Sequence, residues 1–258
     1  MSTPLEGYPL AAAVSPRLQV IDTVDSTNAK LLHDAQGDVE GHPHLSVLLT
    51  RDQRAGRGRL DRSWTAPAGS ALAVSVLLRV SAVAPADRGW IPLIAGAAMT
   101  RAIAAQLPRL PVTLKWPNDV MVGGQKICGI LAEVLPSDPH VVIVGAGVNT
   151  SMASAELPVT TATSFAALGA EADEDRLLAD YLTALRDDIA TLAVHGGTAV
   201  AEKISDMCAS LGVEVSASLP GDVVLEGKAV RLDAEGRLVI AVDGLETVVS
   251  AADIVHLR

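Results

Sequence analysis

Runs of apolar residues, separated by turn-forming residues, divide most of the chain into short strands and longer helices. Their spacing and composition predict strands over 17–24, 45–50, 71–80, 112–115, 119–122, 125–135 and 140–147. Helices are predicted over 29–35, after the cap-like Asp25-Ser26-Thr27-Asn28, and over 89–107, 171–193 and 198–210. The pattern therefore indicates a folded domain that contains both helices and strands.

The pattern changes at Gly212, where short alternating runs begin. Turn-forming residues at 220–222, 235–236 and 243–244 separate these runs at close spacing, which predicts a small β-barrel. A unit of this size is marginally stable by itself, so we expect it to pack against the larger domain. The first 16 residues contain three prolines and are expected to form a loose lead-in, too short for an N-terminal helix-turn-helix module. The expected domains are 1–16, 17–210 and 211–258.

Composition and charge narrow the class of protein. The 258-residue chain is 49% hydrophobic and 19% charged, as expected of a folded globular protein. No apolar run has the length that crosses a bilayer, and the start lacks the features of a signal peptide, so we expect no membrane association and a cytoplasmic location. Two isolated cysteines form no disulfide framework, and His42 and His44 lack further ligands for a protein-bound metal. A net charge of −10 argues against broad nucleic-acid binding.

A strongly basic loop interrupts this acidic chain. Residues 51–64 include five arginines and two aspartates, which sum to a charge of +3. The two glycines of the loop let its backbone approach a ligand closely, and Arg57 and Arg59 offer planar forks suited to carboxylate or phosphate. A solvated surface turn is the alternative, but Trp64 favours a loop with one end anchored on the core. Because the arginines repel one another, we expect 54–63 to be mobile in the free protein and to order over bound ligand as a lid.

A hairpin is predicted by strand-like runs on both sides of a two-residue glycine turn at 123–124. This register pairs Asp119 with Cys128 and Met121 with Lys126, and it places all four side chains on one face. Lys126 and Asp119 are then diagonal neighbours, about 7–8 Å apart along the backbone and within reach of each other. The hairpin thus predicts either a charged functional pair or an ordinary surface ion pair.

Two segments imitate nucleotide-binding motifs and are rejected. Residues 221–228 resemble a P-loop, but five residues separate the glycines and Ala229 replaces the Ser or Thr that would bind magnesium. Residues 141–149 resemble a dinucleotide fingerprint, but Thr150 replaces the third glycine and no helix start follows. Neither segment is expected to bind phosphate in the manner of those motifs.

Five motifs, taken together and in this order, resemble the biotin protein ligases. They are D-S-T-N at 25–28, Q-x-A-G-R-G-R at 53–59 with Trp64, K-W-P-N-D at 115–119, K-x-x-G-I-L at 126–131 and G-A-G-V-N at 145–149. The resemblance covers residues 17 to 258 and is closest to the monofunctional type without an N-terminal DNA-binding domain. Two departures stand out: Asp61 takes the place of a glycine common in the family, and 248–258 lack the tryptophan that some members place against adenine.

The resemblance implies an α+β fold: a mixed β-sheet backed by helices, like that of class II aminoacyl-tRNA synthetases, plus a small C-terminal SH3-like β-barrel. It implies a ligase that joins biotin to ATP, releases pyrophosphate, and passes biotin from biotinyl-5′-AMP to one lysine of a biotin carboxyl-carrier domain of an acyl-CoA or pyruvate carboxylase. Mg²⁺ would accompany ATP without a protein cage. The protein would be a monomer or a weak homodimer.

The resemblance also assigns site residues by position. Biotin would be held by Ser26, Thr27, Gln53, Gly56, Arg57, Lys126 and Gly129. ATP and the adenylate would be held by Arg59, Arg62, Trp64, Asn118, Lys126 and Asn149. The catalytic residues would be Arg59, Lys126 and Asp119, with Asp119 steering or deprotonating the incoming lysine.

Two other functions compete with this interpretation. A lipoate or octanoyl ligase or transferase would share the fold, although the arginine loop and the K-W-P-N-D motif favour biotin. A nucleic-acid-binding regulator could use the arginine loop on phosphates. The positive charge is confined to one short loop, however, and no reading helix or aromatic platform accompanies it.

Overall fold

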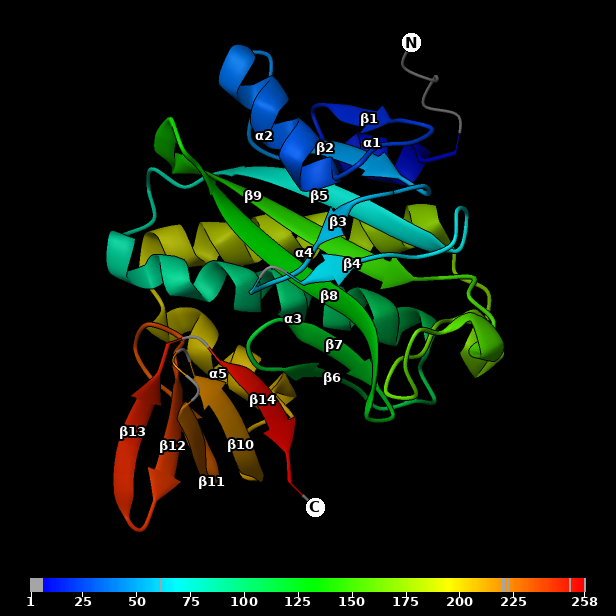
Figure 1. Ribbon diagram of the computed structural model, residues 1–258. Coiled ribbons are helices and arrows are strands. Elements are labelled where there is room, and N and C mark those ends of the chain that lie inside the picture. The colour runs from blue at the N-terminus through cyan, green and yellow to red at the C-terminus, as the bar shows by residue number, and fades with distance from the viewer. Residues whose placement is uncertain (1–6, 61, 220, 222, 251, 258) are drawn as a thin grey trace.

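The computed structural model describes residues 7–60, 62–219, 221, 223–250 and 252–257. Its centre is a seven-stranded sheet in the order β1-β2-β5-β9-β8-β7-β6 (Figure 1). The strands are β1 Leu18–Val20, β2 Ser46–Thr50, β5 Ala71–Arg79, β6 Val112–Lys115, β7 Asp119–Val122, β8 Gln125–Leu135 and β9 Asp138–Asn149. Strands β1 and β2 are parallel and every other recorded neighbour is antiparallel, so the sheet is mixed.

Helices cover both faces of this sheet. The helices are α1 Pro9–Val14, α2 Thr27–Gly37, α3 Ile91–Gln106, α4 Glu174–His195 and α5 Thr198–Met207, with short 3-10 turns at Pro85–Trp90, Ser154–Glu156 and Ala166–Leu168. Helices α3 and α4 pack together behind the sheet (Figure 1), whereas α2 lies on the opposite face and contacts β5, β8 and β9. The prediction of a mixed sheet backed by helices is confirmed.

Alternate residues of the central strands enter two separate hydrophobic clusters. Val76 and Leu78 of β5 belong to the large cluster with α3 and α4, while Leu77 between them packs in a smaller cluster with Leu31 of α2. Side chains of a strand point to opposite faces, so a sheet covered on both faces needs apolar residues at successive positions. This explains why the central strands are visible in the sequence as continuous apolar runs.

The C-terminal strands form a separate antiparallel sheet in the order β13-β12-β11-β10-β14, below the main sheet in Figure 1. They are β10 Glu214–Leu219, β11 Val223–Leu232, β12 Leu238–Val242, β13 Leu245–Val249 and β14 Asp253–His256. This sheet is consistent with the predicted SH3-like domain. Over the residues described, the ladder does not join β13 to β14, so the sheet is not closed into a barrel.

The lead-in differs from its prediction where the structure describes it. Residues Pro9–Val14 form α1, which packs against α4. The backbone amides of Leu10 and Ala11 donate to the carboxylate of Asp175 at 3.0 and 2.9 Å, and the hydroxyl of Tyr8 donates to Glu174 at 2.8 Å. Proline at the first helical position is well tolerated. Carboxylates from a distant helix stabilise this short helix, and local sequence patterns do not reveal such partners.

Candidate active site

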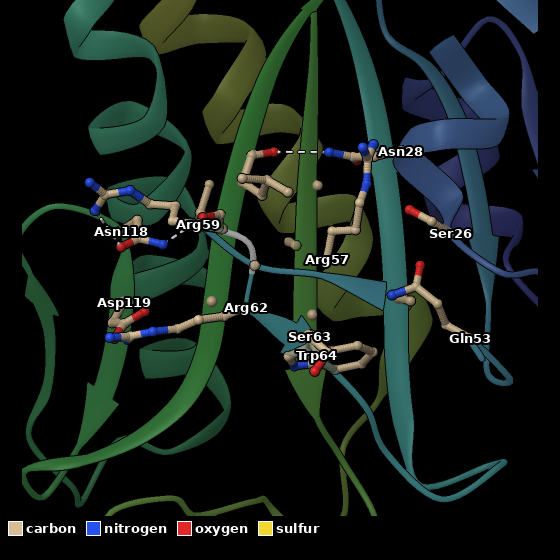
Figure 2. A pocket seen from close by; sticks show the side chains of 18 of the residues that line it. Ser26, Asn28, Gln53, Arg57, Arg59, Arg62, Ser63, Trp64, Asn118 and Asp119 are labelled. Carbon is tan, nitrogen blue, oxygen red and sulfur yellow. Dashed lines mark hydrogen bonds between the residues drawn. The ribbon is translucent and has the colours of Figure 1, made fainter. Parts of the chain in front are cut away.

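A pocket opens on the face of the main sheet that carries α2, beyond the N-terminus of that helix (Figure 2). Its floor is made by β5, β9 and β8, and the arginine loop crosses above it. Eleven predicted site residues line it: Ser26, Thr27, Gln53, Arg57, Arg59, Arg62, Trp64, Asn118, Asp119, Lys126 and Gly129. The fold therefore brings together segments that are separated by more than a hundred residues in the chain.

Strand register explains why this part of the sheet is hollow. Ala73 of β5, Gly147 of β9 and Gly129 of β8 lie opposite one another in one row. A Cβ atom added at Gly147 would lie 2.6 Å from the indole of Trp64, and one added at Gly129 would lie 3.1 Å from Nζ of Lys126. Small residues in this row leave room for side chains and ligand above the sheet. Asp119 and Lys115 continue the same row on β7 and β6.

One end of the pocket is polar and is organised by the start of α2. Ser26 is the N-cap, and its hydroxyl accepts a hydrogen bond from the amide of Ala29, as its sequence position predicts. Both the amide and the hydroxyl of Thr27 donate to Oε1 of Gln53, at 2.8 and 3.0 Å. Gln53 follows β2 and pairs with Val24 in an isolated bridge. Two predicted binding motifs are thus joined directly at this end of the pocket.

Two residues that were not predicted as site residues lie at or beside this polar end: Asn28 lines the pocket, and Glu133 lies next to it. Asn28, only 4% exposed, donates through Nδ2 to the carbonyl of Leu131 at 3.2 Å and to Oε2 of Glu133 at 2.8 Å. Glu133 in turn forms an ion pair with Arg57 at 2.8 Å. Asn28 is inside the D-S-T-N motif, but Glu133 lies beyond every motif, and nothing in the sequence signals its position over the pocket.

The opposite end of the pocket is charged. Nζ of Lys126 lies 2.6 Å from Oδ1 of Asp119, so the predicted pair is in contact. The predicted register is wrong at one point: Asp119 lies opposite Gly129, and Cys128 lies opposite Val120. An extra residue on β8 forms a bulge between the two pairings, and a bulge changes which face each later side chain points to. Asp119, Lys126 and Gly129 consequently share the pocket.

The same bulge turns Cys128 into the core. Its side chain is 1% exposed, and burial raises the pKa of the thiol to about 12. A thiol that stays protonated is a poor nucleophile. The placement of Cys128 on the functional face is therefore corrected, and this cysteine takes no part in the chemistry of the pocket.

Two predicted residues on the arginine loop face the charged end. Nη1 of Arg59 donates to Oδ1 of Asn118 at 3.2 Å, and Figure 2 shows the two side chains together. Burial lowers the pKa of Arg59, while the nearby carboxylates of Asp253 and Asp119 oppose that shift. Arg62 forms an ion pair with Asp253, which belongs to β14 of the C-terminal sheet. Asp253 was not predicted, because it is 191 residues from its partner.

More acidic side chains lie next to the loop arginines than the sequence led us to expect. The sequence suggested that too few acidic groups lie near the arginines, yet Arg54 pairs with Asp52, Arg57 with Glu133 and Arg62 with Asp253. The loop also contains a small two-stranded ladder, β3 Gly56–Arg57 with β4 Ser63–Trp64. Asp61 lies outside the described residues. Asp52 is a local partner, but Glu133 and Asp253 come from distant segments, which short sequence windows do not reveal.

Gly56 and Asn149 lie beside the pocket rather than along its lining. Gly56 is buried where a Cβ atom would lie 2.4 Å from both Nε2 of Gln53 and the carbonyl of Trp64. Asn149 ends β9, and its Nδ2 donates to the carbonyl of Thr163 at 2.9 Å. The G-A-G-V-N motif therefore lies inside a strand, and the P-loop-like segment lies largely in β11, as expected of segments that do not form phosphate loops.

The described residues were also compared with the requirements of a membrane-spanning helix and of a protein-bound metal site. No helix in the described part of the chain is long and apolar enough to cross a membrane. Among the same residues, no group of three or more His, Cys, Asp or Glu side chains is placed to hold a metal ion.

Comparisons with known proteins agree with this geometry. The family model described as the Biotin/lipoate A/B protein ligase family matches residues 20–149. The chain is 38% identical over 247 residues to a biotin–[acetyl-CoA-carboxylase] ligase of Mycobacterium tuberculosis, a match that covers 94% of this chain and 90% of that protein. The structure is similar to the biotin protein ligase of Aquifex aeolicus in complex with biotin and ATP, with a TM-score of 0.78 and 25% identity over 94% of this chain and 99% of that one.

A second solved structure has the same fold. The biotin protein ligase of Leishmania major in complex with biotinyl-5-AMP has a TM-score of 0.60 and 25% identity, and the match covers 92% of this chain and 99% of that chain. The family model spans half of the sequence, and the mycobacterial relative matches nearly all of it. The chain therefore belongs to the biotin/lipoate A/B protein ligase family.

Proposed function

We propose that this protein is a biotin protein ligase, which joins biotin to ATP and transfers biotin from biotinyl-5′-AMP to a lysine of a carboxyl-carrier domain. The observation that carries the proposal is the asymmetry of the pocket. Hydroxyl and amide groups gather at one end, basic side chains gather at the other, and a floor of glycine and alanine connects them. A ligand with a polar ring system, an apolar body and a terminal carboxylate matches this order.

The polar end favours biotin over lipoate or an octanoyl group. Thr27 and Gln53 lie there and already bond to each other, so the amide group of Gln53 is held in place beside the ligand space. The ureido group of biotin can pair with such an amide, whereas a dithiolane ring or an alkyl chain offers it no hydrogen-bonding partner. Unpaired buried polar groups discriminate strongly between ligands. Relatives named as biotin ligases, from M. tuberculosis and Paracoccus denitrificans, support the same choice.

The charged end suits the first step, in which the biotin carboxylate attacks the α-phosphorus of ATP. A C–O–P bond forms, the bond to the β-phosphate breaks, and pyrophosphate leaves. Two anionic groups must approach each other, so Arg59 and Lys126 would offset their repulsion and stabilise charge in the transition state. The carboxylate is itself the nucleophile, so no general base is required. Arg62 would add a further positive charge near the phosphates.

The second step requires a neutral amine. The acceptor lysine attacks the carbonyl carbon of the mixed anhydride, a C–N bond forms, and AMP leaves with the electrons of the C–O bond. A lysine with a pKa near 10.4 is mostly protonated at neutral pH. The carboxylate of Asp119 already holds one ammonium group, that of Lys126, 2.6 Å from Oδ1. We assign Asp119 to binding the incoming ammonium group and to receiving its proton.

Mg²⁺ would enter with ATP. The carboxylates in or beside the pocket, Asp119, Asp253 and Glu133, each lie against an arginine or lysine. Because these carboxylates are already paired with cations, the phosphate oxygens and water would be the main ligands of the ion. This is the usual arrangement for Mg²⁺ in nucleotide sites. Bound in that way, the ion would neutralise phosphate charge. An acceptor domain from an acyl-CoA or pyruvate carboxylase, and a monomeric or weakly dimeric state, remain predictions.

Labelling of a purified carboxyl-carrier domain tests the proposal directly. The protein should attach biotin only when biotin and ATP are both present, and a carrier whose acceptor lysine is changed to arginine should stay unlabelled. Exchange of labelled pyrophosphate into ATP should depend on biotin and not on lipoate. Exchange driven by lipoate or octanoate, with none driven by biotin, would assign the protein to the other branch of its family.

A further inference from the structure

Glu133 occupies an unusual place for an acidic residue in an apolar strand. It lies on β8 four residues beyond Gly129, past the last residue of β8 that pairs with β7. Its side chain is 24% exposed and contacts Arg57 of the arginine loop beside the pocket. Relative to Lys126, it is seven residues along the strand, which corresponds to roughly 23 Å. Glu133 therefore lies beside the polar end of the pocket, away from Lys126.

Glu133 holds two groups at once. Oε2 accepts from Nδ2 of Asn28 at 2.8 Å and from Nη2 of Arg57 at 3.0 Å, while Oε1 lies 2.8 Å from the same guanidinium nitrogen. Figure 2 shows Arg57 extending from the loop across the pocket toward Asn28. The carboxylate thus connects the arginine loop to the first turn of α2.

Asn28 is fixed independently of Arg57. Its Nδ2 also donates to the carbonyl of Leu131 at 3.2 Å, and its Oδ1 accepts from the hydroxyl of Ser75 at 2.5 Å. A Cβ atom at Gly145 would lie 2.4 Å from this Oδ1, so glycine is needed for the amide to rest on the sheet. Both amide hydrogens of Asn28 are committed to the protein. The side chain is therefore suited to holding Glu133 and cannot donate to a ligand.

We propose that Glu133 is a positioning residue that fixes Arg57 over the biotin end of the pocket before biotin binds. The inference rests on the proposed function and extends it to a residue outside the family motifs. The side chain of Arg57 is 47% exposed and extends from a strand of two residues. Ordering so long a side chain has an entropic cost. An ion pair formed in the free enzyme removes that cost from ligand binding.

The proposal predicts different effects on the KM values of the two substrates, biotin and ATP. Glu133 contacts the residue assigned to biotin and lies seven residues along β8 from Lys126, which is assigned to phosphate. The isosteric change Glu133→Gln should therefore raise KM for biotin roughly tenfold, the effect of losing one charge-assisted hydrogen bond. KM for ATP and kcat should change by less than about twofold. Glu246→Gln breaks an exposed pair with Arg231 on the C-terminal sheet and is the matched control.

A double-mutant cycle tests whether Glu133 acts through Arg57. In the Arg57→Ala background, Glu133→Gln should have no further effect on KM for biotin, because the residue to be positioned is absent. Glu133→Asp should fail to restore wild-type KM, since the shorter side chain cannot reach both partners. Additive effects of the two substitutions, equal changes in both KM values, or tighter biotin binding would each overturn the proposal.

Two controls separate this proposal from the proposed function. Melting curves should show that each variant remains folded, because a general loss of stability would alter kcat and both KM values. Wild-type protein that forms no biotinyl adenylate would contradict the proposed function itself. Wild-type activity combined with an unchanged Glu133→Gln variant would contradict only the role of Glu133.

Discussion

At the scale of single residues, the carboxylate of Asp119 is the centre of the charged end of the pocket. Lys115 lies opposite it on β6, and Lys126 approaches from β8. The 2.6 Å contact between Lys126 Nζ and Asp119 Oδ1 is an ion pair between partly exposed side chains. Such a pair contributes little net stability, so Lys126 can exchange Asp119 for a phosphate at small cost.

Replacing Lys126 with alanine should leave the fold intact and slow adenylate formation roughly a hundredfold or more. This is the scale expected when one strong charge interaction is lost from a transition state. Biotin-dependent pyrophosphate exchange measures the effect. Lys30→Ala is the control, because Lys30 also pairs with an aspartate, at 2.8 Å, but on the surface of α2. Near wild-type exchange in a folded Lys126→Ala variant would remove Lys126 from the mechanism.

Gly129→Ala should fold normally and reduce the rate of adenylate formation about tenfold. The new methyl group would lie 3.1 Å from Nζ and 3.2 Å from Cε of Lys126, so the flexible end of that side chain must move. Steady-state kinetics and a melting curve test both parts of the statement. Gly37→Ala is the matched control, since a Cβ atom there meets no atom within 4 Å. A rate equal to wild type would show that the position of Lys126 is not critical.

At the scale of elements, the arginine loop combines a short ladder with contacts to three distant segments. Arg57 reaches β8, Arg59 reaches the turn after β6, and Arg62 reaches β14. The ion pair of Arg62 lies at the pocket edge, where a single exposed pair contributes little, about 0–1 kcal/mol. Arg62 can therefore exchange Asp253 for ligand without a large energetic penalty, while Arg57 keeps the position that Glu133 gives it.

Ligand should protect this loop from trypsin. Arg54, Arg57 and Arg62 have exposed side chains and are sites for the protease. We expect rapid cleavage within 54–62 in the free enzyme and slow cleavage with biotin and ATP, because a closed loop would exclude water and protease from the adenylate. Cleavage after Arg109, in an exposed turn, is the internal control and should not depend on ligand. Equal rates with and without ligands would mean that the loop is not a lid.

At the scale of the whole molecule, the C-terminal sheet is joined to the catalytic part by hydrogen bonds from buried aromatic residues. The indole of Trp90 donates to the carbonyl of Ala234 at 2.9 Å, and that of Trp116 donates to the carbonyl of Gly236 at 3.1 Å. Asp253 on the same sheet lines the pocket. The small sheet thus packs on the larger domain, as expected, and also contributes to its site.

Lowering the pH should weaken the contact between the C-terminal sheet and the catalytic part, because His256 of β14 should gain a proton there. Nε2 of His256 lies 3.0 Å from Oγ of Ser210, which also accepts from the amide of Trp116, and a neutral ring can accept the hydroxyl hydrogen there. Burial, with a smaller effect of Lys115, lowers the pKa of His256 below its usual 6.5. Below that usual value the unfolded chain binds more protons than the folded protein. The stability contributed by the neutral ring is therefore present above about pH 6.5 and is lost as the pH falls.

Melting temperatures measured between about pH 7.5 and pH 5.5 test this coupling. The wild type should lose stability toward the acid end, and His256→Gln should lose less of it. His44 contributes with the same sign, because burial lowers its pKa too, so the difference between variant and wild type isolates His256. His195→Gln, which alters an exposed ring at the end of α4, should keep the wild-type dependence. Identical slopes for wild type and His256→Gln would contradict the assignment.

Local sequence determined the elements and the chemical types present at the site. The strands predicted over 112–115, 119–122 and 125–135 have the observed bounds, because alternation and a two-residue glycine turn are local signals. The turn glycines 123 and 124 have positive φ angles of 57° and 81°, as a tight hairpin requires. Ser26 is the helix cap for an equally local reason. The motifs, through their resemblance to a known family, identified eleven of the residues that line the pocket.

Tertiary structure decided the features that depend on contacts between distant segments. The bulge in β8 places Gly129, and not Cys128, opposite Asp119, because the core takes Cys128 as a buried side chain. Glu133 and Asp253 neutralise loop arginines from 76 and 191 residues away. Carboxylates of α4 stabilise α1 in a segment that was expected to be loose. Hydrophobic pattern reports which face of a strand is buried, but only the packed chain determines which charges meet across the pocket.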